Sequence, residues 1–280
     1  MKKSSRQQCY ITIENDKTIG RQLFKLAYLI NILKTKNNEN VKRKIVFNKD
    51  NKLYYDTLFK GLFNILDNEK YNQIAFEKID INDVMDIMDN INDADTLANI
   101  EISYYTLDKL DTFKNIDGSL RNKVIELVYS NEDLMYSAYY KYRDVINYFG
   151  NNTKDDDAAV MHFLKGDDTD YYNNALSYMK DAYKITNIAV ITDDINWAKI
   201  ALNDINRDNS YSFYYITTGD KDSYEINFIL MSMFKNFIVT DKKECCSDSL
   251  WASYISYYEN KRVIASSSIS EIHKYITDIL

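Results

Sequence analysis

The 280-residue chain contains no proline, only three cysteines and only two histidines. Without proline, helices and turns lack the residue that most often marks their ends. The odd set of cysteines, Cys9 and the adjacent pair Cys245 and Cys246, excludes a framework of spaced disulfides and provides no CxxC spacing for zinc. Two histidines exclude a histidine-rich metal site. We therefore expect a protein that uses no metal and no other cofactor.

Long apolar runs and an excess of positive charge are also missing. No stretch approaches the about 20 apolar residues that a membrane-spanning helix needs. The N-terminal MKKSSRQQ is not followed by an apolar segment as long as that of a secretory signal. Lysine and arginine number 35 against 42 aspartate and glutamate, and the net charge of −7 disfavours nucleic acid as a partner. We expect a cytoplasmic protein with no membrane span.

Strand-like apolar runs alternate with segments of helical periodicity along the whole chain, which predicts an α/β protein. Strands are expected near residues 9–14, 44–47, 73–79, 158–162, 188–191, 212–215, 237–239 and 262–265. Helices are expected near residues 18–36, 55–66, 120–129, 131–149, 171–183, 196–205, 222–234 and 269–280. The acidic segment 81–95 is interpreted as a solvated amphipathic helix.

The polar run at residues 150–157 is the best candidate for a linker. It predicts an N-terminal α/β domain over residues 1–153 and a C-terminal one over residues 154–280. The terminal segment 269–280 is expected to pack back across the junction as a helix.

The most informative segment is 158–199, a strand–helix–strand unit whose strands both end in polar clusters. His162, Lys165 and Asp167 follow the first strand, and Thr192, Asp193 and Asp194 follow the second. In an open parallel sheet, ligands bind outside the carboxyl ends of the strands. Both clusters should therefore face one crevice.

These residues also carry a resemblance to a known family. HFLKGDD (162–168) resembles the HxRRGDY element of the alpha-1,2-fucosyltransferases, and ITDDINWAK (191–199) resembles their FSDDIEWCK element. The segment 20–24 resembles the family's GxxGNQLFQ start. Residues 230–239, 251–254 and 263–265 resemble its LMSLCKHNII, SWWGAYL and VIAP segments. The matches keep the family's order from Gly20 to Ala265.

The resemblance implies two Rossmann-like domains facing a central cleft, the GT-B architecture, with an acceptor-side domain followed by a nucleotide-sugar-binding domain. It implies an inverting, metal-independent transfer of fucose or a related sugar from a GDP-sugar to a glycan hydroxyl. The donor-binding positions that it implies are His162, Lys165, Asp167, Thr192, Asp193, Asp194, Ser247, Ser249, Gly20 and Gln22. No carboxylate is singled out as the catalytic base, and the oligomeric state is not indicated.

Two departures from the family pattern concern the phosphate contacts. Leu164 stands where the family has its first motif arginine, and Lys165 replaces the second. Lysine is a point charge without arginine's bidentate fork. The alternative to an active enzyme is therefore a GT-B module that has lost catalysis and serves in binding or assembly. A third reading is an α/β interaction protein unrelated to sugars.

Several of these residues also have ordinary structural interpretations. His162 could be a strand-end histidine satisfied by a backbone carbonyl. Asp193 and Asp194 could cap the following helix, which is compatible with the guanine recognition that the resemblance implies for an acidic residue of this element. Trp197 is interpreted as a core residue, and Gly20 and Gln22 could belong to an ordinary helix N-terminus.

Overall fold

The computed structural model describes residues 8–13, 18–35, 42–48, 58–59, 61–62, 65–66, 68–80, 99–103, 118–150, 153–218, 221–239 and 246–264. By contacts between residues, the chain divides into two compact units, Met1–Val124 and Ile125–Leu280. The sequence predicts a boundary later, at 153/154. The contacts place helix α6 (Glu132–Phe149) with the C-terminal unit, because it packs against helix α9 (Lys221–Ser232).

The N-terminal unit contains a parallel sheet with the strand order β2-β1-β6-β5. Its elements are β1 (Gln8–Ile13), α1 (Ile19–Thr35), β2 (Lys42–Ile45), β3 (Phe47–Asn48), β4 (Ile65–Leu66), α2 (Asn68–Asn72), β5 (Phe76–Asp80) and β6 (Asn99–Ser103). Strands β3 and β4 form a separate parallel pair. As predicted, α1 begins after Thr18, whose hydroxyl accepts a hydrogen bond from the Arg21 N–H at 3.4 Å.

Two predictions for this unit differ from the structure. The helix expected at 55–66 is wrong over its described part, which forms turns at 58–59 and 61–62 and then strand β4. Strand β6 was not expected, because NIEIS offers only two buried positions, Ile100 and Ile102, and lies beside polar sequence. The acidic segment 81–95 lies outside the described residues.

The C-terminal unit holds a five-stranded parallel sheet with the order β11-β10-β7-β8-β9. Its elements are α6, a short 3₁₀ turn (Asp155–Asp157), β7 (Ala158–His162), α7 (Thr169–Tyr183), β8 (Asn187–Thr192), α8 (Ile195–Ile205), β9 (Ser212–Thr217), α9, β10 (Asn236–Ile238), α10 (Cys246–Ile255) and β11 (Arg262–Ile264). Helix α5 (Gly118–Ser130) runs across the division between the units. Helix α10 was not predicted, and the segment 269–280 lies outside the described residues.

The order of these five strands is that of a Rossmann-type sheet. The chain goes from β7 outward through β8 to β9, then returns to the other side of β7 with β10 and continues outward to β11. The strand order therefore reverses between β7 and β10. In such sheets the crevice at the carboxyl ends of the strands, at this reversal, is where ligands bind. The predicted α/β architecture with two parallel sheets is confirmed.

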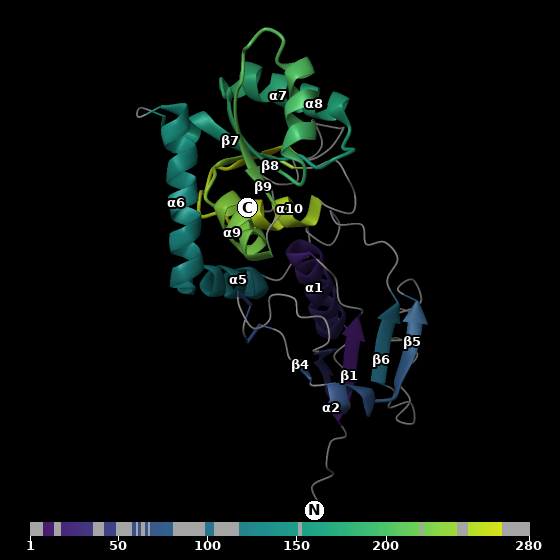
Figure 1. Ribbon diagram of the computed structural model, residues 1–280. Helices are drawn as coiled ribbons and strands as arrows, with labels where there is room; N and C mark the ends of the chain where they lie inside the picture. The colour runs from purple at the N-terminus through teal and green to yellow at the C-terminus, as the bar shows by residue number, and fades with distance from the viewer. Residues whose placement is uncertain are drawn as a thin grey trace, which may run out of the picture. The chain divides into compact units, whose positions relative to one another are not determined.

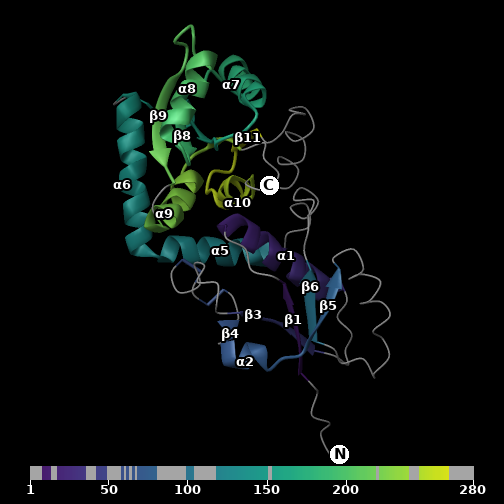
Figure 2. The ribbon, with the colours of Figure 1, turned by 45° about the vertical axis from the view of Figure 1, so that its right-hand side comes forward.

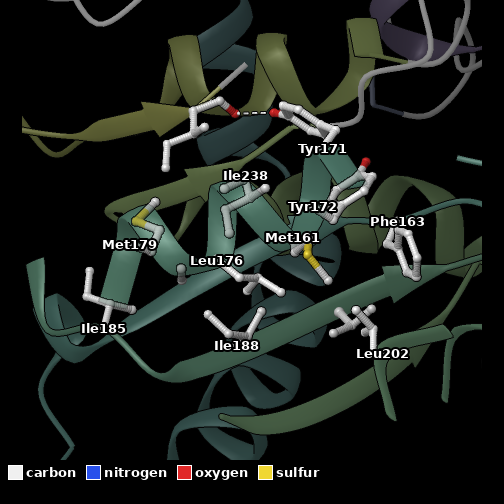
Figure 3. Packing of buried hydrophobic residues seen from close by; sticks show 14 of the residues in the cluster. Met161, Phe163, Tyr171, Tyr172, Leu176, Met179, Ile185, Ile188, Leu202 and Ile238 are labelled. Carbon is white, nitrogen blue, oxygen red and sulfur yellow. Dashed lines mark hydrogen bonds between the residues drawn. The ribbon is translucent and has the colours of Figure 1, made fainter. Parts of the chain in front are cut away.

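Helices cover both faces of the C-terminal sheet, with α7 and α8 on one side and α9 and α10 on the other (Figures 1 and 2). The core between the sheet and α7 is formed by buried residues such as Met161, Leu176, Met179 and Ile188 (Figure 3). The helical residues recur at spacings of three and four, which is the pattern that predicted this helix. Trp197 packs against the same core, as expected. None of the described helices is long and apolar enough to cross a membrane.

Two adjacent tyrosines fix the first turn of α7 to the carboxyl edge of the sheet. The Tyr171 hydroxyl lies 3.0 Å from the Val239 carbonyl and 3.2 Å from the Ile264 carbonyl, beside the ends of β10 and β11. The Tyr172 hydroxyl donates to the carbonyl of His162 at 2.6 Å. Both side chains are buried. These bonds hold the ends of three strands to one helix.

The core packing predicts the cost of removing a side chain from α7. Leu176 is fully buried, so Leu176→Ala should lower the free energy of unfolding of the C-terminal unit by about 2–5 kcal/mol. Asn174→Ala, at an exposed position of the same helix, should change it by less than about 0.5 kcal/mol. Urea unfolding followed by circular dichroism measures both. Equal effects for the two variants would contradict this packing.

Candidate functional site

The candidate site is built on the two loops that follow β7 and β8. The strands are parallel neighbours with His162 paired to Ile191, so both loops emerge at the same edge of the sheet. The loop after β7 turns at Lys165 and Gly166, and Gly166 has a φ of +81°, a backbone conformation that favours glycine. This turn leads into Asp168, which caps α7 by accepting the Asp170 N–H. The sequence-predicted clusters are therefore brought together.

Lys165 connects the two loops directly. Its backbone N–H donates to Asp193 Oδ1 at 2.8 Å, and its Nζ lies 3.0 Å from Asp194 Oδ2. The other oxygen of Asp194 accepts the Trp197 N–H at 3.0 Å, so Asp194 is also the N-cap of α8. The hydrogen bond from Trp197 and that from Lys165 hold the pKa of Asp194 below its usual value. The capping role expected for this residue is confirmed.

Asp167 closes the first loop. Its side chain is buried, and its Oδ2 accepts the Leu164 N–H at 2.7 Å and lies 3.1 Å from the Tyr172 hydroxyl. Thr192, also buried, accepts the Asp194 N–H with its hydroxyl at 3.2 Å. Both residues thus shape the loops from inside, and the exposed parts of the cluster are Lys165 and Asp193.

His162 is the unusual member of the cluster. Its side chain is only 5% exposed, and its buried Nδ1 has no hydrogen-bond partner within the described part of the chain. Burial lowers the pKa of His162 to about 4, against the opposing effect of the Asp193 carboxylate nearby. The imidazole is therefore neutral near pH 7. A buried polar atom without a partner costs free energy, so it calls for an explanation such as a ligand or water.

The side chains of His162 and Asp194 approach the carboxyl edge of the sheet from opposite faces. Ala159 and Met161 belong to the core beneath α7, so alternation along β7 turns His162 to the opposite face. Asp194 begins α8, which lies on the α7 side. His162 and Asp194 therefore share only the carboxyl edge of the sheet, and the prediction that both clusters face one crevice is wrong for this pair.

The remaining predicted residues lie on other elements. Ser247 and Ser249 lie in α10, the helix that follows β10 in the chain, and Ser249 is buried. Strand β10 is the neighbour of β7 on the other side of the strand-order reversal. Gly20 and Gln22 lie in the first turn of α1 in the N-terminal unit, and both are buried. The prediction that all ten residues contribute to one donor site therefore stays a prediction.

A separate groove of about 560 Å³ lies between α7 and α8. Polar side chains line most of it, including Asn173, Ser177, Lys180 and Asp208. It contains none of the predicted donor-binding residues. Within the described ranges, no group of three or more His, Cys, Asp or Glu side chains is arranged to hold a metal ion.

Sequence reasoning missed the two tyrosines that support the site. Tyr171 and Tyr172 were interpreted only as the start of a helix, yet their hydroxyls anchor the strand ends. The signal available in the sequence was a pair of aromatic residues with polar handles next to a loop rich in Asp and Gly. Buried tyrosine hydroxyls usually find a hydrogen-bond partner.

Among curated proteins, the chain is similar to a distant relative that is a glycosyltransferase. The chain is 25% identical over 163 residues to the O-antigen biosynthesis glycosyltransferase WbnK of Escherichia coli, covering 52% of this chain and 49% of that protein. The chain thus spans about half the length of this curated relative. No protein-family model matches the chain.

Among solved structures, the chain is similar to the E. coli ADP-heptose LPS heptosyltransferase II. The likeness covers 97% of both chains at 9% identity with a TM-score of 0.39. At that score it carries no weight for the fold or function of this chain.

The lowered pKa of His162 predicts a pH dependence of stability. The unfolded state takes up a proton near pH 6.5, whereas the folded state resists protonation until about pH 4. The free energy of unfolding should therefore fall as the pH decreases from about 6.5 toward 4, by about 3 kcal/mol from this residue. Above pH 6.5 the contribution is fully present.

The measurement is urea unfolding of the wild type and His162→Gln across pH 4–7. The difference between the two free energies isolates His162, because glutamine does not titrate. A difference that does not change with pH would show that the imidazole titrates normally in the folded protein.

Proposed function

We propose that this chain is a glycosyltransferase whose C-terminal sheet binds a nucleotide sugar at its carboxyl edge. The observation that carries the location is the buried, unpartnered Nδ1 of His162 at the end of β7, beside the reversal of strand order. The similarity to a glycosyltransferase over about half of each chain supports the class of activity. We further propose that the two α/β units are the halves of a GT-B enzyme.

The chemistry of the edge suits a ligand that combines negative charge with hydroxyl groups. A neutral imidazole does not neutralise a phosphate, but it can donate or accept one hydrogen bond to a phosphate or sugar oxygen. Lys165 provides a positive charge in the adjacent loop. In a transfer from a nucleotide sugar, negative charge develops on the leaving diphosphate, and such a cation stabilises it.

The donor sugar follows from the family resemblance. The match of 162–168 and 191–199 to the motifs of alpha-1,2-fucosyltransferases favours GDP-fucose or a related GDP-sugar, with inversion at the anomeric carbon. Asp193 or Asp194 would accept hydrogen bonds from guanine, and a glycan hydroxyl would be the acceptor. Asp194 can keep its capping bond to Trp197 through one oxygen while the other is exchanged between Lys165 and the ligand.

The ion pair between Lys165 and Asp194 sets the cost of using Lys165 as a phosphate clamp. The Lys165 side chain is 61% exposed and that of Asp194 is 34% exposed, so the pair contributes little to stability. A diphosphate can therefore compete for the lysine at small cost. We propose that Lys165 leaves Asp194 and contacts the diphosphate when the donor binds.

The second candidate function is a binding module without catalysis. It is favoured by Leu164, which stands in place of the family's motif arginine and is partly buried in this structure. With one cation in place of two, the leaving diphosphate is less well stabilised. In this reading the chain binds a nucleotide sugar or glycan but does not transfer the sugar.

Binding is tested by isothermal titration with GDP and with GDP-fucose, in the absence of added metal. Lys165→Ala should weaken the affinity for either ligand about tenfold or more, because a charge-assisted hydrogen bond is worth roughly 1.5–3 kcal/mol. Lys199→Ala, which removes an exposed lysine from α8, is the matched control and should bind as the wild type does. If neither ligand binds at millimolar concentration, a GDP-sugar is not the donor.

Catalysis is then tested by release of GDP from GDP-fucose with a panel of glycan acceptors. Leu164→Arg should raise donor affinity and turnover if the loop still works as a diphosphate clamp. Tight binding by the wild type without turnover, unchanged in Leu164→Arg, would favour the inactive module.

A further inference from the structure

The outward face of helix α6 carries an aromatic stripe that the proposed enzymatic activity does not use. Tyr136, Tyr139 and Tyr140 are 62%, 48% and 50% exposed, so about half or more of each residue's surface is open to solvent. The Tyr136 and Tyr140 rings lie 4.5 Å apart in an edge-to-face arrangement. Large exposed aromatic groups on one face commonly mark an interaction site.

The stripe is distinct from the face by which α6 belongs to the fold. Ala138, Tyr142 and Val145 are buried, and Tyr142 packs edge-to-face on Phe234 after α9 at 5.1 Å. With 3.6 residues per turn, the three exposed tyrosines lie on the side of α6 opposite to this buried face. The stripe continues along the helix through three more exposed residues, Glu132, Arg143 and Asn147.

When two copies of the stripe run in opposite directions, each of its six residues faces a residue with which it makes a favourable contact. In an antiparallel pair of α6 helices related by a two-fold axis between positions 139 and 140, Tyr139 faces the other copy's Tyr140. Tyr136 then faces the other copy's Arg143, and Glu132 faces the other copy's Asn147. These are an aromatic pair, a guanidinium on an aromatic ring and a carboxylate on an amide, all favourable contacts. We propose that two copies of this chain associate through this stripe, which we call the α6 stripe.

Charge is consistent with a second copy as the occupant. The α6 stripe contains one acidic and one basic residue, Glu132 and Arg143, so it is neutral although the chain carries −7. Outside the stripe, the net negative charges of the two copies repel each other. At 0.1 M salt, this repulsion is largely screened beyond about 10 Å. The dimer should therefore become tighter as the salt concentration rises, as expected for a contact made by aromatic side chains.

The size of the stripe limits how tightly two copies can associate. From Glu132 to Asn147 it spans sixteen residues, and the fifteen steps between them make it about 22 Å long at 1.5 Å per residue. One helix on its counterpart buries less than the roughly 1,600 Å² of a standard stable interface, so the dissociation constant should be in the micromolar range. Symmetric two-fold dimers are the most common form of self-association.

Sedimentation equilibrium of the full chain from about 1 to about 100 µM tests the proposal. The wild type should shift from monomer to dimer across this range. The double substitution Tyr139→Glu and Tyr140→Glu, which brings four carboxylates to the two-fold axis, should remain monomeric. Arg143→Glu is a second, milder variant, and it should weaken the dimer about tenfold by removing the guanidinium opposite Tyr136.

Tyr148→Glu is the matched control. Tyr148 is 58% exposed on the same helix but lies outside the stripe, beside Tyr214. This variant should dimerise as the wild type does. A wild type that stays monomeric at every concentration would overturn the proposal, and so would a dimer that persists in the Tyr139→Glu, Tyr140→Glu variant. Circular dichroism confirms that each variant is folded.

Discussion

Two buried tyrosine hydroxyls at the start of α7 hold the carboxyl edge of the C-terminal sheet in place. Tyr171 reaches the carbonyls beside β10 and β11, and Tyr172 reaches the carbonyl that ends β7. The Ile264 carbonyl also accepts the Val239 N–H at 2.9 Å, and the tyrosine hydroxyls add further hydrogen bonds to the carbonyls at the strand ends. Because the strand-order reversal lies at the same edge, the bonds also define the floor of the candidate site. Tyr172 is further connected to it through Asp167.

This anchoring explains how His162 stays in an unfavourable environment at the carboxyl edge of the C-terminal sheet. With the end of β7 fixed, the His162 imidazole stays buried with an unpartnered nitrogen, and its pKa stays low. Residues held in unfavourable states by a rigid surrounding structure are concentrated at functional sites. The neighbouring Lys165 is instead exposed and weakly held by Asp194, so it can respond to a ligand. A buried neutral group and an exposed cation at one edge suit the hydroxyl and phosphate oxygens of the proposed ligand.

Much of the C-terminal unit could be predicted from the sequence. The strands β7 and β8 are continuous buried apolar runs, and the amphipathic spacing of α7 between them is clear. The polar residues after each strand therefore predicted the Lys165–Asp193–Asp194 cluster. The direction of His162 follows from alternation along β7, but it could not be assigned without knowing which face of the sheet α7 covers. The anchoring by Tyr171 and Tyr172 could not be predicted, because it depends on how the packed helix meets the strand ends. The N-terminal unit was less predictable, since the short strands β4 and β6 have too few buried positions to establish a period.

The central claim is that a nucleotide diphosphate reaches His162 at the carboxyl edge of the C-terminal sheet. Nuclear magnetic resonance of protein with isotope-labelled histidine tests it, with His162→Gln to assign the signal and the other histidine, His273, as internal reference. On saturation with GDP, the imidazole signals of His162 should shift, because Nδ1 gains a hydrogen-bond partner that it lacks without ligand. GDP binding that leaves the His162 signals unchanged would contradict the account.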